Sequence, residues 1–277
     1  MKRLLVSTLP ALLFFIAFPG LIFAQQAPRY DNPLNEEIAL EARLELRARD
    51  LAVLKITVRD EVARKKRYET LIAEYRKDIA AYPYSKFPIV LKAYAGLADV
   101  FLEIGDLKHE LDVWKEALRL QPGYAAASHN MGVAYFRLKQ YSDATKAFES
   151  ALRLMIVDAH YTYTWLGKVY AETKQYEKAE KAYLEAIKLK PEYADAHDGL
   201  GTAYSELNQP SQARASHLKA VSLDPQSSEF LLNLGYRYLS DGMKAEAEGV
   251  REKLETMDAQ KAGELLAKIN AAPAGTP

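Results

Sequence analysis

Cysteine is absent from the 277 residues of this chain. Without thiols the protein can form neither a disulfide nor a thiolate metal site, so its stability must rest on a hydrophobic core. An excess of charge of one sign is missing as well, because 37 Lys and Arg residues balance 37 Asp and Glu residues. Proteins that bind nucleic acids concentrate Lys and Arg on one face, and this balance shows no such excess. We therefore expect no nucleic-acid partner.

Motifs that carry catalysis are also missing. The five histidines are scattered along the chain, with neither an HExxH motif nor a His pair at helical ligand spacing. The chain contains no G-x-S-x-G nucleophile motif and no glycine-rich phosphate loop. Its many carboxylates lie among lysines, as is typical of solvent-exposed helix faces. We predict that the protein is not an enzyme and that it uses no metal and no other cofactor.

A pattern that returns every 34 or 35 residues is the main positive feature of the chain. Each copy has Leu or Met, then Gly or Ala, then an aromatic residue three places further on. The five copies are Leu97, Ala98 and Phe101; Met131, Gly132 and Tyr135; Leu166, Gly167 and Tyr170; Leu200, Gly201 and Tyr204; and Leu234, Gly235 and Tyr238. An alanine follows twelve residues after the small residue in every copy except the first, where Glu110 stands. A period of this length predicts a solenoid of stacked units.

The copy at residues 160–193 shows what each repeated residue is for. Leu166 and Tyr170 are four residues apart, so they share one face of a first helix. Ala179 and Tyr183 mark one face of a second helix, and Pro191 ends that helix because it lacks a backbone donor. The small residues are predicted where the paired helices cross, and the large aromatic residues where successive pairs meet.

In this order and at this spacing, the residues resemble the tetratricopeptide repeat, a helix–turn–helix unit of 34 residues. Prolines that close a repeat and aromatic residues in the second helix add to the resemblance: Pro122, Pro191 and Pro225, and Trp114, Phe148 and Tyr183. His217 stands at the aromatic place of the fourth repeat, where we expect it to be a packing residue. The resemblance covers about residues 91–256 and implies an all-α, right-handed α-solenoid of stacked helix–turn–helix repeats.

The repeat boundaries follow from the period. We predict five repeats, at residues 91–124, 125–159, 160–193, 194–227 and 228–258. The second helix of the fifth is degenerate, since Arg251 and Glu255 stand where apolar residues are expected. A capping helix at 259–270 and a disordered tail at 271–277 are predicted to follow. Between the second and third repeats the proline is missing, so residues 155–157 are expected either to extend the helix or to form an exposed partner site.

Residues 1–24 have the layout of a secretory signal peptide. Lys2 and Arg3 precede an apolar run that ends at Phe23, and cleavage is expected after Ala24. The run is also nearly long enough to span a bilayer, so an uncleaved anchor is the alternative. Either arrangement predicts an exported bacterial protein. Its repeats would lie in the periplasm, or outside the cytoplasm on a membrane anchor that makes the only membrane contact.

The segment between residue 25 and the repeats is rich in charge. We interpret residues 25–51 as a linker and a charged helix. Residues 52–85 are interpreted as a degenerate repeat that caps the N-terminal end of the solenoid. The basic cluster at residues 64–67 is expected in a turn between two helices. Leu44, Leu51 and Val58 recur every seven residues, so a coiled-coil seam is the rival interpretation, which predicts a homo-oligomer.

The family resemblance implies where a partner binds, because first helices of such repeats line a concave groove that holds peptides or single helices. Carried over to this chain, the groove residues are His129, Asn130, Phe136, Tyr161, Trp165, Lys168, Asp195, Asp198, Glu206, Asn233 and Tyr236. Trp165 is expected either to anchor the partner or to stack between helices. Asn130 and Asn233 either hold a peptide backbone or solvate the helix. The acidic residues of the fourth repeat suggest a partner that is basic at one end.

The sequence thus favours a non-catalytic scaffold or adaptor for other proteins of the bacterial cell envelope, with a peptide or helix bound in the groove. The alternative is a structural envelope component that assembles with itself through the N-terminal helices.

Overall fold

The computed structural model describes residues 33–57, 61–81 and 88–272, and these residues form helices and short connections. The predicted signal segment (1–24) and residues 273–277 of the predicted tail lie outside them. The helices are α2 (Pro33–Thr57), α3 (Glu61–Ala81), α4 (Pro88–Glu103), α5 (Leu107–Leu120), α6 (Ala125–Arg137), α7 (Tyr141–Arg153), α8 (Ala159–Glu172), α9 (Tyr176–Leu189), α10 (Ala194–Glu206), α11 (Pro210–Leu223), α12 (Ser228–Ser240), α13 (Lys244–Glu255) and α14 (Ala259–Ala271).

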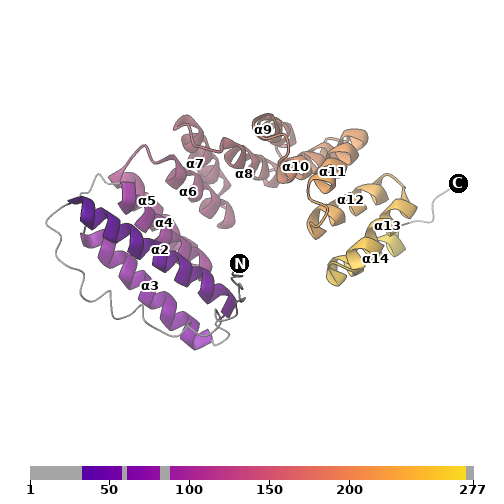
Figure 1. The fold of residues 1–277 in the computed structure, drawn as a ribbon. Helices are drawn as coiled ribbons and strands as arrows, with labels where there is room; N and C mark the ends of the chain where they lie inside the picture. Colours follow the sequence, from indigo (N-terminus) through magenta and orange to yellow (C-terminus); the bar gives the residue numbers. More distant parts are fainter. Residues whose placement is uncertain (1–32, 58–60, 82–87, 273–277) are drawn as a thin grey trace, which may run out of the picture.

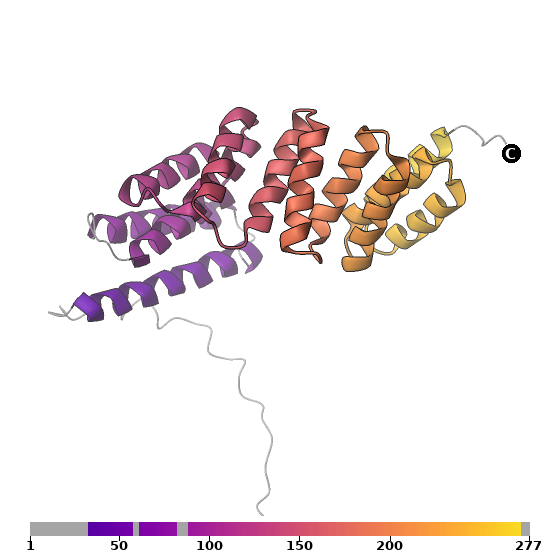
Figure 2. The same cartoon turned by 90° about the horizontal axis from the view of Figure 1, so that it is seen from above.

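Successive helix pairs follow one another in an arch (Figure 1). The pairs are α4/α5, α6/α7, α8/α9, α10/α11 and α12/α13, and the view from above shows them as a single row (Figure 2). The first helices α6, α8, α10 and α12 contact one another in sequence, whereas no comparable contact joins successive second helices within the described residues. The first helices therefore lie on the inner, concave side. This arrangement confirms the predicted all-α solenoid of helical repeats.

The turn inside each pair is built in the same way. The second residue after each first helix has a left-handed backbone: Gly105, Lys139, Lys174, Asn208 and Gly242. The next residue donates its backbone N–H to the carbonyl of the repeated aromatic residue, for example Gln140 to Tyr135 at 2.9 Å and Gln175 to Tyr170 at 2.8 Å. This 6→1 hydrogen bond is the Schellman motif, which satisfies carbonyls at a helix end. The same local closure thus recurs in each of the five pairs.

Aromatic rings of the second helices fill the space between pairs, as predicted. Phe148 and Tyr183 are buried, and each ring lies against a glycine of its own first helix. A methyl group added at Gly167 would lie 2.7 Å from a Tyr183 ring carbon, and one added at Gly199 of the next repeat would overlap the same ring. Glycine is therefore needed on both sides, because any larger side chain would displace the ring.

The connection between the second and third repeats differs from the predicted helix extension. Helix α7 ends at Arg153, and both Met155 (φ 56°) and Asp158 (φ 57°) have left-handed backbones. Without the proline, a compact turn rather than a longer helix connects α7 to α8. Met155 and Val157 are 88% and 83% exposed, so the expectation of a helix extension packed on its neighbour is wrong.

The N-terminal end also differs from the prediction. The predicted boundary between residues 51 and 52 lies inside α2, and the basic cluster at 64–67 lies inside α3 instead of a turn. The physical reason is a continuous buried face, because Leu40, Leu44, Leu51 and Leu54 are all buried on one side of α2. The side chains of Leu44 and Leu51 are buried within the protein, so they do not form the seam of the alternative coiled coil.

Helix α14 closes the C-terminal end. Leu265 is fully buried in one cluster with Leu231 and Leu254, and its side chain lies directly over Gly235. Arg251, which departs from the repeat pattern, is half-buried and pairs with Glu248 at 2.8 Å and Glu255 at 3.0 Å. The predicted capping helix is therefore present, and the polar second helix of the fifth repeat forms its own ion pairs.

Candidate functional site

The predicted groove residues lie on four first helices of the concave side (Figure 1). Helix α6 carries His129, Asn130 and Phe136; α8 carries Tyr161, Trp165 and Lys168; α10 carries Asp195, Asp198 and Glu206; and α12 carries Asn233 and Tyr236. The period places these residues on corresponding helices, but they differ in how far their side chains are buried. Some side chains are open to solvent, and others are used inside the solenoid.

An aromatic cluster forms the middle of this side. The Trp165 ring lies 5.3 Å from the ring of Phe136 in an edge-on arrangement, and it stacks at 6.5 Å on the buried ring of Phe148. The Lys168 ammonium lies 4.9 Å above the Trp165 ring. Trp165 is half-buried, so it both stacks between helices and keeps part of its surface available. The two roles predicted for it are therefore compatible.

The side chain of His129 makes its contacts inside the solenoid. Its Nδ1 shares a hydrogen bond of 2.9 Å with the Thr162 hydroxyl on α8, and its ring packs on Phe148. Burial lowers the pKa of His129 to about 4, because a charged imidazolium would lose its solvation there. At neutral pH, His129 is therefore an uncharged link between α6 and α8.

Tyr161 is the most exposed aromatic residue of the predicted groove, at 42%. It lies at the start of α8, where its ring packs on His160 at 4.1 Å and on Tyr193 at 5.2 Å. The Lys190 ammonium lies within 6 Å of both tyrosine rings. This cluster at the edge of the concave side presents a partly exposed tyrosine ring and a lysine ammonium.

Asp198 and Asn233 are brought together, but in an internal network. Asp198 is buried, and its carboxylate accepts a hydrogen bond from Asn233 Nδ2 at 2.8 Å and contacts His217 Nδ1 at 2.8 Å. The three residues belong to α10, α11 and α12, so the network joins the fourth and fifth repeats. His217 is buried over Gly201, which makes it the packing residue that the sequence predicted. Polar partners replace the aromatic contacts of the other repeats because an imidazole needs them when buried.

The remaining acidic groove residues stay near the surface. Asp195 is half-buried and accepts a hydrogen bond from the Tyr193 hydroxyl, while burial and this carboxylate together raise the pKa of Tyr193. Glu206 is exposed and accepts from Tyr176, whose pKa is raised by that bond. The predicted acidic patch is thus reduced to Asp195 and Glu206, since Asp198 is enclosed. Asn130 and Tyr236 are half-buried.

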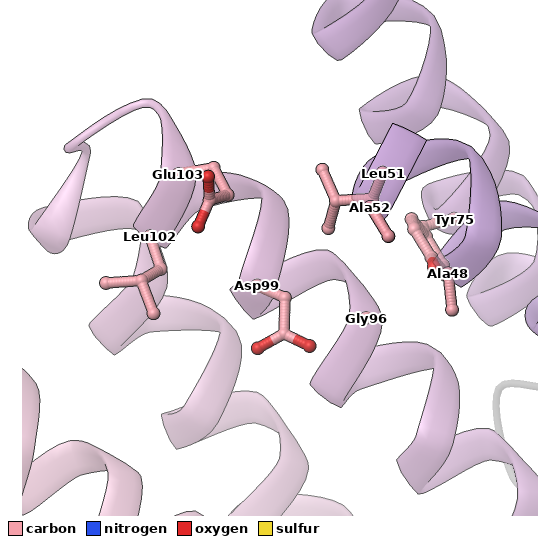
Figure 3. A pocket seen from close by; sticks show the side chains of 8 residues that line it. All are labelled: Ala48, Leu51, Ala52, Tyr75, Gly96, Asp99, Leu102 and Glu103. Atoms are coloured by element: carbon pink, nitrogen blue, oxygen red, sulfur yellow. The ribbon is translucent and has the colours of Figure 1, made fainter. Parts of the chain in front are cut away.

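A second hollow lies at the N-terminal end of the arch. An open hollow of about 260 Å³ is lined by residues of α2, α3 and α4 (Figure 3). Leu51 on α2 faces Asp99 and Glu103 on α4 across it, with Tyr75 beside Gly96 at its base. Desolvation raises the pKa of Tyr75 to about 12. Sequence reasoning missed this hollow, although one signal was present. Gly96 stands where Asn130 and Asn233 stand in other repeats, which removes a side chain from the place.

A buried carboxyl group was also missed. Glu110 on α5 is 4% exposed, with the Trp114 indole beside its carboxyl group. Burial raises the pKa of this group. The signal in the sequence was its position, which the other repeats fill with alanine.

Neither a metal-binding cluster nor a membrane-spanning helix occurs in the described ranges. No group of three or more His, Cys, Asp or Glu side chains in 33–57, 61–81 and 88–272 is placed to hold a metal ion. In the same part of the chain, no helix combines the length and apolar composition needed to cross a membrane.

Comparisons with known proteins agree with the repeat pattern. A model of the TPR repeat matches residues 167–208, and two models of the tetratricopeptide repeat match residues 125–156 and 194–227. No curated protein matches the chain in sequence. Among solved structures, PilF of Pseudomonas aeruginosa superposes with a TM-score of 0.65 at 17% identity, over 84% of this chain and 99% of that chain.

Two other solved structures are similar. PilW, described as a widely conserved type IV pilus biogenesis factor, has a TM-score of 0.64 at 17% identity, over 74% of this chain and 94% of its own. YrrB, described as a TPR protein with an unusual peptide-binding site, has a TM-score of 0.52 at 20% identity, over 70% of this chain and 97% of its own. At such identities the likeness shows a shared fold.

Proposed function

We propose, from the premise that this chain contains tetratricopeptide repeats, that it is a scaffold that holds a segment of a partner protein along its concave side. Proteins built from these repeats bind other proteins or peptides and are typically non-catalytic. The proposal adds the location of binding: the inner faces of α6, α8 and α10. It assigns no reaction to the protein.

The observation that carries the proposal is the combination of half-open aromatic rings with polar neighbours on α6 and α8. Tyr161 is 42% exposed, and Trp165 is half-buried with Lys168 over its ring. Aromatic side chains held rigidly by packing lose little entropy when a partner covers them, and such residues often dominate an interface. Phe136 supports Trp165 from the side, so the ring is already oriented before a partner arrives.

The chemistry of this surface favours an extended peptide or a single helix with one basic end. Asn130, half-buried on the same helix as Phe136, offers an amide to a partner backbone. Asp195 and Glu206 keep carboxylates near the surface of α10, where a Lys or Arg of the partner would be attracted. Asp198 takes no part, because its oxygens are bound by His217 and Asn233. The peptide-binding site in the description of YrrB supports this choice.

The place of action that we propose is the bacterial cell envelope. The support is the signal-like pattern of residues 1–24 together with the fold shared with PilF and PilW. Export with cleavage after Ala24 would release the repeats into the periplasm, and retention of the segment would anchor them to the membrane. N-terminal sequencing of the protein from fractionated cells separates the two. A start at Gln25 supports cleavage, and retention of Met1 in the membrane fraction supports the anchor.

The groove is tested with a matched pair of variants. Tyr161 on α8 and Leu184 on α9 are each 42% exposed, but they lie on a first and a second helix. The double variant Asn130→Ala, Tyr161→Ala removes groove contacts, whereas Leu184→Ala truncates a side chain of the same fractional exposure as Tyr161 on the outer side. Partners captured from an envelope extract are identified by mass spectrometry, and their affinities are then measured with purified components.

We expect the groove variant to weaken partner binding by about tenfold or more, since anchors of this kind contribute roughly 1–2 kcal/mol or more each. The Leu184→Ala variant should bind like the parent. The reverse result, with loss only in Leu184→Ala, would move the interface to the outer side and contradict the proposal. Circular dichroism of both variants checks that the helices are retained.

A further inference from the structure

Helix α2 has an exposed apolar stripe on the side opposite to its buried face. Ile38 is 58%, Leu46 49% and Val53 56% exposed, and Ala42 is exposed between them. At 100° per residue these four positions point within one 80° sector, directly away from buried Leu40, Leu44, Leu51 and Leu54. The view from above places α2 along the edge of the N-terminal end, with the rest of the arch on one side of it (Figure 2).

This stripe differs from the scattered exposed apolar residues elsewhere. The helices α9, α11 and α14 expose single leucines or pairs, such as Leu184, Leu218 and Leu266. An apolar side chain that is exposed alone needs no explanation, but a row of them along one helix indicates an interaction surface. Helix α2 has 25 residues, so the row runs along a helix of about 37 Å and offers several turns of contact.

The charged residues on this face indicate which molecule would pack against it. Glu45 and Arg49 are exposed on the outward side, one turn apart near the middle of the stripe. Other charged residues of α2 point back to the body: Arg47 contacts Asp78, Arg43 lies 3.4 Å from Asp78, and Glu41 pairs with Lys92. A second α2 in antiparallel orientation, with the two-fold axis near residue 47, brings Glu45 opposite Arg49 of the other copy. In a parallel pair, Arg49 would face Arg49 and Glu45 would face Glu45.

We propose that two copies of this chain pair through the outer faces of their α2 helices, antiparallel, around a two-fold axis that passes between the helices at the level of residue 47. The interface buries Ile38, Ala42, Leu46 and Val53 of both copies and forms two Glu45–Arg49 ion pairs. A self-complementary surface of this kind is what a two-fold dimer requires, because each contact occurs twice. The residues of this interface lie on α2, whereas the proposed binding surface lies on α6, α8 and α10.

The absence of cysteine makes a clean test possible in the full chain. Any disulfide-linked dimer must come from an introduced residue, and disulfide formation requires Cα atoms within about 7 Å. Leu46→Cys lies next to the proposed axis, so mild oxidation should link two copies and double the 31.1 kDa mass of one chain on a non-reducing gel. Ile38→Cys alone should not link, because the two positions would lie at opposite ends of the contact. A mixture of Ile38→Cys and Val53→Cys chains should link to each other.

Leu266→Cys is the matched control. Leu266 is 39% exposed on α14, far along the chain from α2, and should give no linked dimer under the same oxidation. Self-linking of Ile38→Cys would show a parallel pair and overturn the antiparallel arrangement. A failure of Leu46→Cys to link above the level of Leu266→Cys would overturn the α2 dimer.

Charge reversal gives a second, independent measurement. Arg49→Glu should abolish the dimer in light scattering, since it places four carboxylates around the axis. Adding Glu45→Arg should restore it, because the pairs re-form with exchanged signs. A dimer that survives Arg49→Glu, or a double variant that stays monomeric while its circular dichroism matches the parent, would contradict the proposed contact.

Discussion

Tyr183 fills the space between the third and fourth repeats because glycines on both sides leave room for its ring. Gly167 and Gly199 belong to successive first helices, and each lies within contact of the same buried side chain. Elsewhere, Gly263 is a helical glycine, and no atom of the described residues lies within 4 Å of the place of a Cβ. Glycine is therefore required for packing at positions 167 and 199, whereas at position 263 it is not.

We expect Gly167→Ala and Gly199→Ala each to lower the free energy of unfolding by about 1–3 kcal/mol through overpacking against Tyr183. Gly263→Ala should raise it by about 0.5–1 kcal/mol, because alanine loses less conformational freedom in a helix. Denaturant unfolding measures all three. Equal behaviour of the three variants would show that Tyr183 is not confined as described.

His129 provides a pH-dependent prediction. Its folded pKa of about 4 lies below the ordinary value of 6.5, so its contribution to stability is fully present above pH 6.5 and is lost as the pH falls toward 4. Between pH 7 and pH 5 this group alone should remove about 2 kcal/mol. His129→Gln keeps a hydrogen-bonding group for Thr162 but does not titrate. The drop in unfolding free energy of the parent should therefore exceed that of the variant by about this amount, and parallel curves would contradict it.

At the scale of the element, α2 and α3 are joined by charge more than the other pairs. Arg47 and Asp78 are both buried and in contact, Arg47 also lies 3.2 Å from Glu74, and Arg67 contacts Asp50. Ion pairs of this kind depend on every partner being present, because an unpaired buried charge is costly. The loss of a single charged residue should therefore be enough to destabilise the packing of α2 against α3, the N-terminal pair of helices.

Asp78→Asn should destabilise the N-terminal pair by about 3–5 kcal/mol, since it leaves the buried Arg47 without its main counter-charge. Hydrogen exchange in α2 and α3 should rise strongly. Asp112→Asn removes an exposed pair with Lys115 at 3.2 Å and should change exchange little. Unchanged protection of α2 in Asp78→Asn would show that apolar contacts with α4 hold it alone.

At the scale of the whole molecule, stability is distributed along the arch. The buried residues form separate clusters, one around α2–α5, others in the middle and one around α12–α14. In such a solenoid each unit depends on its neighbours and on its caps, so damage should stay local.

Leu265 and Leu266 test this with adjacent residues on α14. Leu265 is fully buried over Gly235, and Leu266 is 39% exposed. Leu265→Ala should cost about 2–5 kcal/mol and speed hydrogen exchange in α12–α14, while α4 and α5 keep their protection. Leu266→Ala should leave both regions unchanged. Equal loss of protection along the whole chain in Leu265→Ala would mean that the arch unfolds as one cooperative unit.

The architecture of the repeats could be predicted from the spacing of residues along the chain. A period of 34 or 35 residues, the small residues at helix crossings and the aromatic rings between pairs require only local spacing, so they can be read without coordinates. The capping helix and the packing role of His217 were predictable for the same reason. Where the period is broken, at residues 155–157 and before residue 88, the predictions of an extended helix and of a boundary at 51/52 were wrong.

Which groove residues are open to solvent depends on packing between helices. Asp198 and Asn233 belong to the same predicted face as Tyr161, but contact with His217 across three helices encloses them. The repeat period assigns a residue to a face of its own helix. Its exposure depends also on the side chains that neighbouring helices pack against it. The outward stripe of α2 follows the same rule, because the burial of Leu44 and Leu51 against the body leaves Ile38 and Leu46 facing outward.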